Sequence, residues 1–127
     1  MSDCCTVYFR SGTCDLAAAA RSLGECGLTV TRTGDGLTVS WPDSPKFRIR
    51  LVTGDRVKAE AAAVGKGTPH AAALRKCDAR IEIGISDLDE ALDEINSLME
   101  VQCALQEASQ GYLYLPWNGN LSEPLQE

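Results

Sequence analysis

The sequence has no basic residue in its last 47 positions. All twelve lysines and arginines lie at or before Arg80, together with eight acidic residues, whereas Ile81 to Glu127 hold ten carboxylates. The net charge is therefore +4 up to Arg80 and −10 beyond it, which gives −6 in total. Such an asymmetry favours an interaction with a charged partner and says little about the fold.

Several class-defining patterns are also missing. No apolar run reaches the roughly 18 residues that a membrane span needs, and the start, Met-Ser-Asp-Cys-Cys, lacks the basic and apolar regions of a signal peptide. The six cysteines include no Cys-x-x-Cys pair and His70 is the only histidine, so a structural zinc site is not expected. We expect a cytoplasmic protein with reduced thiols, no metal, no cofactor and no membrane contact.

Catalysis has little support in the residues. Cys14 lies in the first turn of an expected helix, where the helix dipole lowers a thiol pKa, but nothing places His70 beside it as a base. Residues 65–70, Gly-Lys-Gly-Thr-Pro-His, resemble a phosphate-binding loop without the P-loop pattern. Nucleic-acid binding is disfavoured by a pI near 4.7 and by the absence of a motif of that class. These features favour a non-catalytic protein and leave weak catalysis open as the alternative.

The patterns that are present indicate one α+β domain. A chain of 127 residues can bury its own core without disulfides or metals. Apolar alternation predicts strands, and apolar residues at helical spacing predict helices. Strands are expected at 6–10, 28–31, 37–41, 47–51, 79–85 and 112–115. Helices are expected from about 13 to 24, 55 to 64, 68 onward and 86 to 109.

This order of elements predicts a two-layer sandwich. Alternating strands indicate that helices cover only one face of the sheet, and a crossover helix between strands often returns a parallel strand. We expect a mixed, mostly antiparallel sheet of about six strands with helices on one face. The domain spans 1–116, and 117–127 is a turn-rich tail in which Asn118-Gly119 favours a hairpin and a further short strand.

The uncovered face of the sheet is the first candidate binding site. Arginine and tyrosine are favoured contact residues in protein interfaces. The alternative is a solvated face with cross-strand pairs, such as arginine with Glu82. Strand alternation places the following residues on this face: Arg48, Arg50, Arg80, Tyr112 and Tyr114.

The expected helix at 86–109 is the second candidate. It holds no lysine or arginine to relieve its negative charge, so its field can steer a basic partner. An ordinary solvated face is the alternative. In its second half, Val101, Cys103 and Leu105 face different ways, so this half is either buried on more than one side or an interface, for example of a homodimer. The candidate partner-binding acids are Asp87, Asp89, Glu90, Asp93, Glu94 and Glu100.

Together these features predict a small acidic, non-catalytic protein-binding domain. Its most concrete form is an immunity-type inhibitor or a chaperone of a basic protein, with charge complementarity as the physical reason. The alternative is a small-molecule or nucleotide-binding domain, with or without weak enzymatic activity, that uses residues 65–70.

Overall fold

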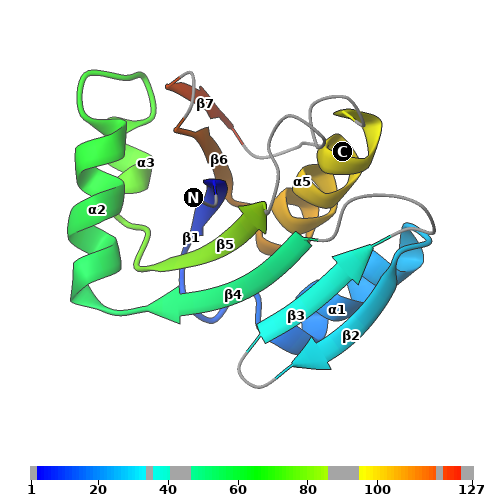
Figure 1. Cartoon of the computed structure of the whole chain (residues 1–127). Helices are drawn as coiled ribbons and strands as arrows, with labels where there is room; N and C mark the ends of the chain where they lie inside the picture. Colours follow the sequence, from blue (N-terminus) through cyan, green and yellow to red (C-terminus); the bar gives the residue numbers. More distant parts are fainter. Residues whose placement is uncertain (1–2, 34–35, 41–46, 86–94, 117–118, 124–127) are drawn as a thin grey trace.

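The structure is a computed structural model that describes residues 3–33, 36–40, 47–85, 95–116 and 119–123 (Figure 1). Its strands are β1 (Asp3–Phe9), β2 (Thr29–Thr33), β3 (Gly36–Ser40), β4 (Phe47–Thr53), β5 (Ala79–Ile85), β6 (Tyr112–Leu115) and β7 (Asn120–Ser122). They form one sheet of order β2-β3-β4-β5-β1-β6-β7, and each described pairing is antiparallel.

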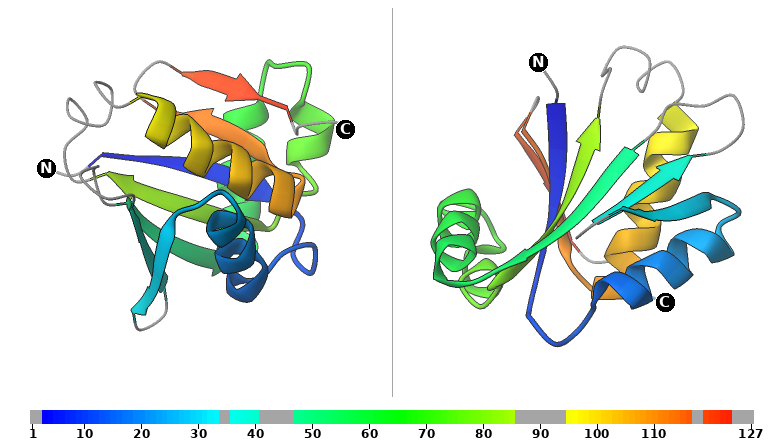
Figure 2. Two further views of the ribbon diagram at one scale, coloured as in Figure 1. Left: turned by 90° about the vertical axis from the view of Figure 1, so that its right-hand side faces the viewer. Right: turned by 60° about the horizontal axis from the view of Figure 1, so that its bottom comes forward.

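Helices lie against both faces of this sheet. The helices are α1 (Leu16–Glu25), α2 (Asp55–Gly65), α3 (Ala71–Leu74) and α5 (Ile95–Ser109). Two views of the ribbon show α1 and α5 on one face and α2 with α3 on the other (Figure 2). The helix α1 also packs directly against α5.

Local signals set the limits of α1. Asp15 caps its start, because the carboxylate accepts a hydrogen bond of 2.8 Å from the Ala18 amide. After its end, Gly27 adopts a φ of 91°, a left-handed conformation that glycine tolerates without strain. The Gly27 amide donates to the Gly24 carbonyl at 3.0 Å and the chain turns into β2. In the sheet, β2 lies at the edge.

The main core fills the space between the sheet and the α1/α5 layer. Alternation along β4 and β5 buries one side of each strand, so that Phe47, Ile49, Ile81 and Ile83 have no exposed surface. From the helices, Leu23, Leu98, Val101 and Leu105 meet this side. Burying each large apolar side chain stabilises the fold by about 1.5–3 kcal/mol.

A second, smaller core lies on the other face. Val57 and Ala61 of α2 and Leu74 of α3 pack around Tyr8, which is only 2% exposed. The two helices approach each other closely at Gly65, where a Cβ atom would lie 2.6 Å from Leu74 Cδ1. A glycine is therefore needed at this crossing for steric reasons, not for its backbone freedom.

The α+β class and the single small domain predicted from the sequence are confirmed. The structure differs in three details: the sheet has seven strands, its described pairings are all antiparallel, and helices cover part of the second face. The helix α1 connects β1 to β2, but these two strands are not neighbours in the sheet. Because β1 lies between β5 and β6 and β2 lies at the far edge, this connection produces no parallel pair.

The chain beyond Leu115 adds the seventh strand. Gly119, with a φ of 72°, precedes β7, and Leu121 of β7 pairs with Tyr114 of β6. This is the short strand expected after Asn118-Gly119. Among the described residues, no helix combines the length and the apolar character that a membrane crossing requires.

Candidate functional site

The register of the sheet places the predicted surface residues on one face. In antiparallel pairs, directly opposed residues point to the same side. Arg50 lies opposite Glu82, Arg48 lies opposite Thr38, and Arg80 lies opposite Tyr8. Tyr8 in turn lies opposite Tyr112, and Thr6 lies between Glu82 and Tyr114. The three arginines and the two tyrosines predicted for this face therefore share it.

The part of this face formed by β2, β3 and β4 is open. Arg48 and Arg50 are exposed, as are Thr29 and Thr31 of the edge strand β2. We call the surface formed by these four residues with the half-buried Thr38 and Ser40 the polar sheet face. It carries two guanidinium groups and no apolar side chain.

The charge of Arg50 is only weakly compensated. Its Nη1 atom lies 3.9 Å from Glu82 Oε2, and its side chain is 59% exposed. An ion pair at this distance in water contributes little to stability. The guanidinium group is therefore available to a partner that presents a carboxylate.

Arg80 belongs instead to an interior network. Its Nη2 atom lies 2.6 Å from Glu82 Oε1, and its Nη1 atom forms an ion pair with Glu60 of α2. The Tyr8 hydroxyl donates to the other oxygen of Glu60 at 2.6 Å. Only 19% of the Arg80 side chain is exposed, so this arginine fixes α2 on the sheet and is not a surface contact residue.

The two predicted contact tyrosines are also largely covered. Tyr112 and Tyr114 are half-buried and pack against the smaller core with Val52 and Leu121. The rings of Tyr112 and His70 lie 5.2 Å apart. The prediction of a fully open face differs from the structure here, because α2 and α3 cover the apolar end of the face.

The acidic helix is described only in part. Of its predicted contact residues, Asp87, Asp89, Glu90, Asp93 and Glu94 lie outside the described residues, whereas Glu100 is exposed on α5. Exposed Glu107 lies two turns further along the same helix. Burial, followed by the negative charges of Glu100, Glu107 and Glu25, raises the pKa of the Cys26 thiol.

The second half of α5 is buried on more than one side. Val101 and Leu105 are fully buried, and the amide side chains of Gln102 and Gln106 are buried as well. Gln102 Nε2 donates to the Cys5 sulfur at 3.5 Å. Of the two alternatives for this half, burial explains its apolar groups, although Met99 remains 49% exposed.

The structure does not support a nucleophilic role for Cys14. This residue precedes the Asp15 cap, is buried, and donates its thiol hydrogen to the Asp15 carbonyl. Burial, followed by the negative charge of Asp15, raises its pKa. Among the described hydrogen bonds, none joins Cys14 to His70, which contacts Tyr112.

The loop at 65–70 satisfies its own polar groups. The Thr68 hydroxyl donates to the Gly65 carbonyl at 2.7 Å and accepts from the His70 amide at 3.1 Å. The helix that follows, α3, has only four residues. The loop therefore gives no particular support to a phosphate site. Within the described part of the chain, no three His, Cys, Asp or Glu side chains converge in a way that could hold a metal ion.

Sequence reasoning missed the contribution of Glu60. Its position did carry a signal, because Glu60 lies three residues after Val57 and four before Val64, on the side of α2 that packs against the sheet. A carboxylate on the apolar side of a helix requires a buried cation, and Arg80 supplies it.

Comparisons with other proteins do not add a functional assignment. No protein-family model, curated protein or solved structure matches this chain.

Proposed function

We propose that this chain is a non-catalytic protein-binding domain that acts through the polar sheet face. The observation that carries the proposal is the pair of exposed arginines, Arg48 and Arg50, on a sheet face that the helices leave uncovered. Thr29 and Thr31 supply hydroxyl groups at the edge, where β2 has no described neighbour on its outer side. The fitting partner is a protein segment that presents carboxylates.

Arginine suits this role because its planar group binds a carboxylate through two parallel hydrogen bonds. The two arginines are two residues apart on β4, on the same side of one strand. A partner that pairs with both would be held in register along the strand. Because both groups are well exposed, charge complementarity would mainly raise the association rate and make it dependent on salt.

The experiment compares capture of partners from extracts of the producing cells by three forms of the protein. The first is the wild type, the second carries Arg48→Glu and Arg50→Glu, and the third carries Arg21→Glu and Arg32→Glu. The control pair reverses the same number of exposed charges on α1 and on the opposite side of β2. Loss of the captured protein with the second form alone supports the proposal. Equal capture by the second and third forms would rule out this surface.

An immunity-type inhibitor or a chaperone of a basic protein remains the second proposed function. The observation that favours it is the group of exposed carboxylates Glu25, Glu100 and Glu107 on the α1/α5 side of the molecule. A basic partner would be attracted to this side, and the predicted acids at 87–94 would extend the surface. Charge reversal at Glu100 and Glu107 should then slow association with that partner, whereas the Arg48/Arg50 variant should not.

A further inference from the structure

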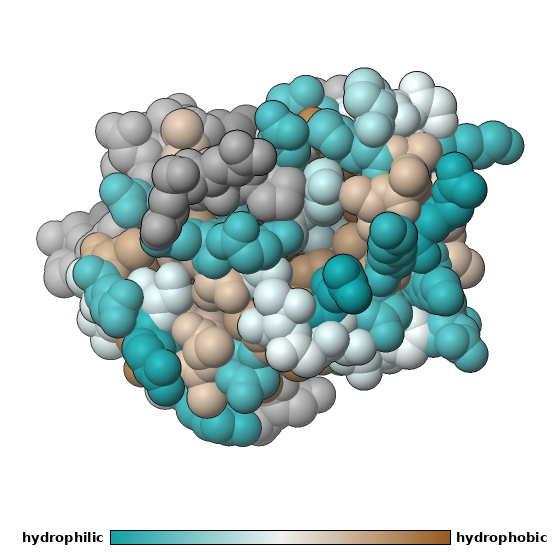
Figure 3. Space-filling model, turned by 180° about the vertical axis from the view of Figure 1, so that it is seen from behind, coloured by the Kyte–Doolittle hydropathy of each residue, from teal (hydrophilic) through white to brown (hydrophobic). Residues whose placement is uncertain are grey.

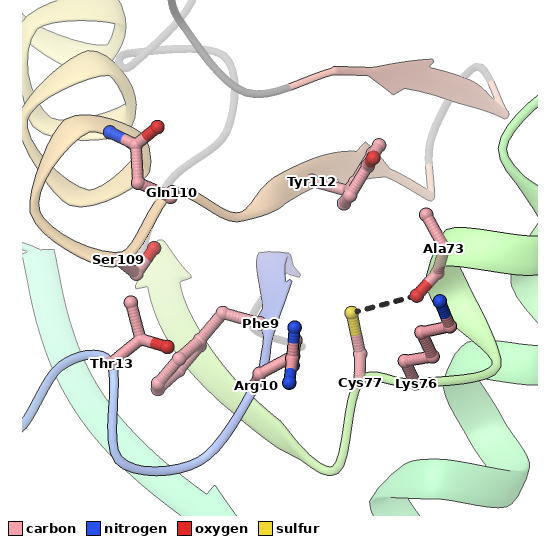
Figure 4. Close-up of a pocket in the computed structure, with 9 residues that line it drawn as sticks. All are labelled: Phe9, Arg10, Thr13, Ala73, Lys76, Cys77, Ser109, Gln110 and Tyr112. Atoms are coloured by element: carbon pink, nitrogen blue, oxygen red, sulfur yellow. Dashed lines mark hydrogen bonds between the residues drawn. The ribbon is translucent and has the colours of Figure 1, made fainter.

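A cavity at the end of the sheet is separate from both proposed surfaces. Its volume is about 400 Å³, within the range of small-molecule sites. It lies where β1 and α5 end, beside the turn between α3 and β5 (Figure 4). Seen from behind, the surface is hollowed near its centre, where hydrophobic atoms lie deeper than the hydrophilic side chains around them (Figure 3).

The inner wall of the cavity is apolar and uncharged. Phe9 and Tyr112 line the cavity from opposite faces of the sheet: Phe9 is 1% exposed and belongs to the main core, whereas Tyr112 is half-buried beside the smaller core (Figure 4). Cys77 is buried, and burial followed by the charge of Asp78 raises its pKa to about 11, so its thiol stays protonated at neutral pH. This thiol donates to the Ala73 carbonyl at 3.6 Å. The wall therefore suits a flat apolar group and offers no nucleophile.

The rim of the cavity is basic. Arg10 and Lys76 are the two charged residues among those that line it, and both are exposed. No carboxylate of the described residues lies within 4.0 Å of either cation. These two cations give the rim a positive charge in a chain whose net charge is −6.

Negative groups near the cavity accept hydrogen bonds from the protein itself, and Asp78, whose pKa these bonds lower, keeps its negative charge beside Cys77. The Asp78 carboxylate accepts from the Ser11 amide and hydroxyl, each at 2.8 Å. At the end of α5, the Leu105 carbonyl accepts from the Ser109 hydroxyl at 2.7 Å, and the Gln106 carbonyl accepts from the Gly111 amide at 3.3 Å. These bonds reduce the negative charge that a helix C-terminus would otherwise direct at the cavity.

We propose that this cavity binds a small organic anion. A carboxylate or phosphate group would pair with Arg10 and Lys76, with the Thr13 hydroxyl as a further donor on the same side (Figure 4). The apolar body of the ligand would lie against the half-buried ring of Tyr112. The Tyr112 hydroxyl stays protonated, because burial raises its pKa, so it does not repel the anion.

The test is a titration of the full-length, isotope-labelled protein followed by NMR. The probes are phenyl phosphate, 3-phenylpropanoate, the neutral 3-phenylpropan-1-ol and inorganic phosphate. At least one aromatic anion should cause saturable shifts at the amides of Arg10, Thr13, Cys77 and Tyr112. The alcohol and inorganic phosphate should bind at least about tenfold more weakly, since each lacks one half of the recognition. Comparison of the two aromatic anions shows which head group the cavity prefers.

Variants separate a specific site from general attraction. Arg10→Gln and Lys76→Gln should each weaken binding of the better anion by about tenfold or more. Arg75→Gln is the matched control, because Arg75 is exposed beside Lys76 but does not line the cavity. Ala73→Leu should block binding by filling the space while leaving the amide spectrum of the sheet intact. Equal binding of the alcohol, an equal effect of Arg75→Gln, or no saturation by either aromatic anion at millimolar concentration would each overturn the proposal.

Discussion

Glu60 of α2 and Arg80 of β5 form an ion pair that joins the α2/α3 layer to the sheet. The Glu60 carboxylate also accepts a hydrogen bond from Tyr8 at 2.6 Å, and Arg80 also contacts Glu82 at 2.6 Å. The Arg80 Nε atom is buried and has no hydrogen-bond partner among the described residues. Arg80 thus depends on its two carboxylates for compensation of its charge.

Removal of the Glu60 side chain should destabilise the protein. Glu60→Ala leaves Arg80 with one carboxylate and the buried Tyr8 hydroxyl without an acceptor, at a cost of about 2 kcal/mol. Glu60→Gln keeps an acceptor for Tyr8 but removes the negative charge that pairs with Arg80. This loss should cost about 1 kcal/mol, because the partial exposure of Glu60 weakens the ion pair. Urea unfolding measures both values.

The control for this prediction is Lys58→Ala, which removes an exposed charge from the same helix. It should change the free energy of unfolding by less than about 0.5 kcal/mol. Equal losses for Glu60→Ala and Lys58→Ala would mean that the network does not stabilise the α2/α3 layer.

Two glycines should respond to alanine with opposite signs. At Gly65, a Cβ atom would lie 2.6 Å and 2.8 Å from atoms of Leu74, so Gly65→Ala should push α2 and α3 apart at a cost of about 1–3 kcal/mol. At Gly24, within α1, no atom lies within 4 Å of an added Cβ. Gly24→Ala should therefore stabilise by about 0.5–1 kcal/mol, because alanine reduces the entropy of the unfolded chain. Thermal unfolding of both variants is the measurement. A higher melting temperature for Gly65→Ala would contradict the packing described at Gly65, and a lower one for Gly24→Ala would contradict the open space at Gly24.

The stability of the protein should fall above pH 9. Burial raises the pKa of Cys5 from 9.0 to about 12 and is also the main cause of the rise at Cys77 to about 11. Above pH 9, the unfolded chain releases thiol protons that the native state keeps, so the stabilisation is complete below pH 9 and is lost as the pH rises through the folded pKa values. The expected loss is about 1 kcal/mol per thiol for each pH unit within this window.

Comparison with Cys77→Ala isolates this effect from other alkaline titrations. The variant should lose less stability than the wild type between pH 8 and pH 10 in urea unfolding, whatever its stability at pH 8. Thiol labelling at pH 8 gives an independent measurement, since exposed Cys4 should react first and exposed Cys26 more slowly because its pKa is raised, whereas Cys5 and Cys77 should react only on unfolding. Parallel pH profiles for variant and wild type would contradict the assignment.

The alternating strands could be predicted because the signal is local. Arg48 and Arg50 alternate with Phe47, Ile49 and Leu51, and this pattern alone fixes which side of β4 faces water. Arg80 was placed on the same face by the same rule, and the register confirms its position. Its burial was not predicted, because burial depends on where α2 crosses the sheet, which the spacing of residues within a strand does not determine.

Two residues nevertheless indicated the second helix layer. Val52 follows Leu51 and breaks the alternation of β4 on the side that would otherwise be wholly polar, and it packs against the smaller core. Glu60 places a carboxylate on the inner side of α2. Each is weak alone, since single apolar residues are common on open sheet faces. The predicted acidic turns at 86–94 lie outside the described residues and stay a prediction.

Gln106 should prove essential for the attachment of β7. Its side chain is 3% exposed, and its Nε2 atom donates to the carbonyls of Gly111, Ser122 and Glu123, at 3.3, 3.4 and 3.0 Å. Gln106→Leu keeps most of the volume but removes the donor, so these carbonyls lose a shared partner at a cost of about 1–3 kcal/mol.

The loss of stability in Gln106→Leu should be local, because β7 has only three residues and pairs only with β6 among the described strands. Amide hydrogen exchange should therefore accelerate in β7 more than in β1 or β5. Gln110→Leu is the control, since exposed Gln110, just after α5, donates only to the Glu107 carbonyl of that helix among the described contacts. Uniform acceleration across the sheet in Gln106→Leu would show that Gln106 supports the core as a whole instead of β7.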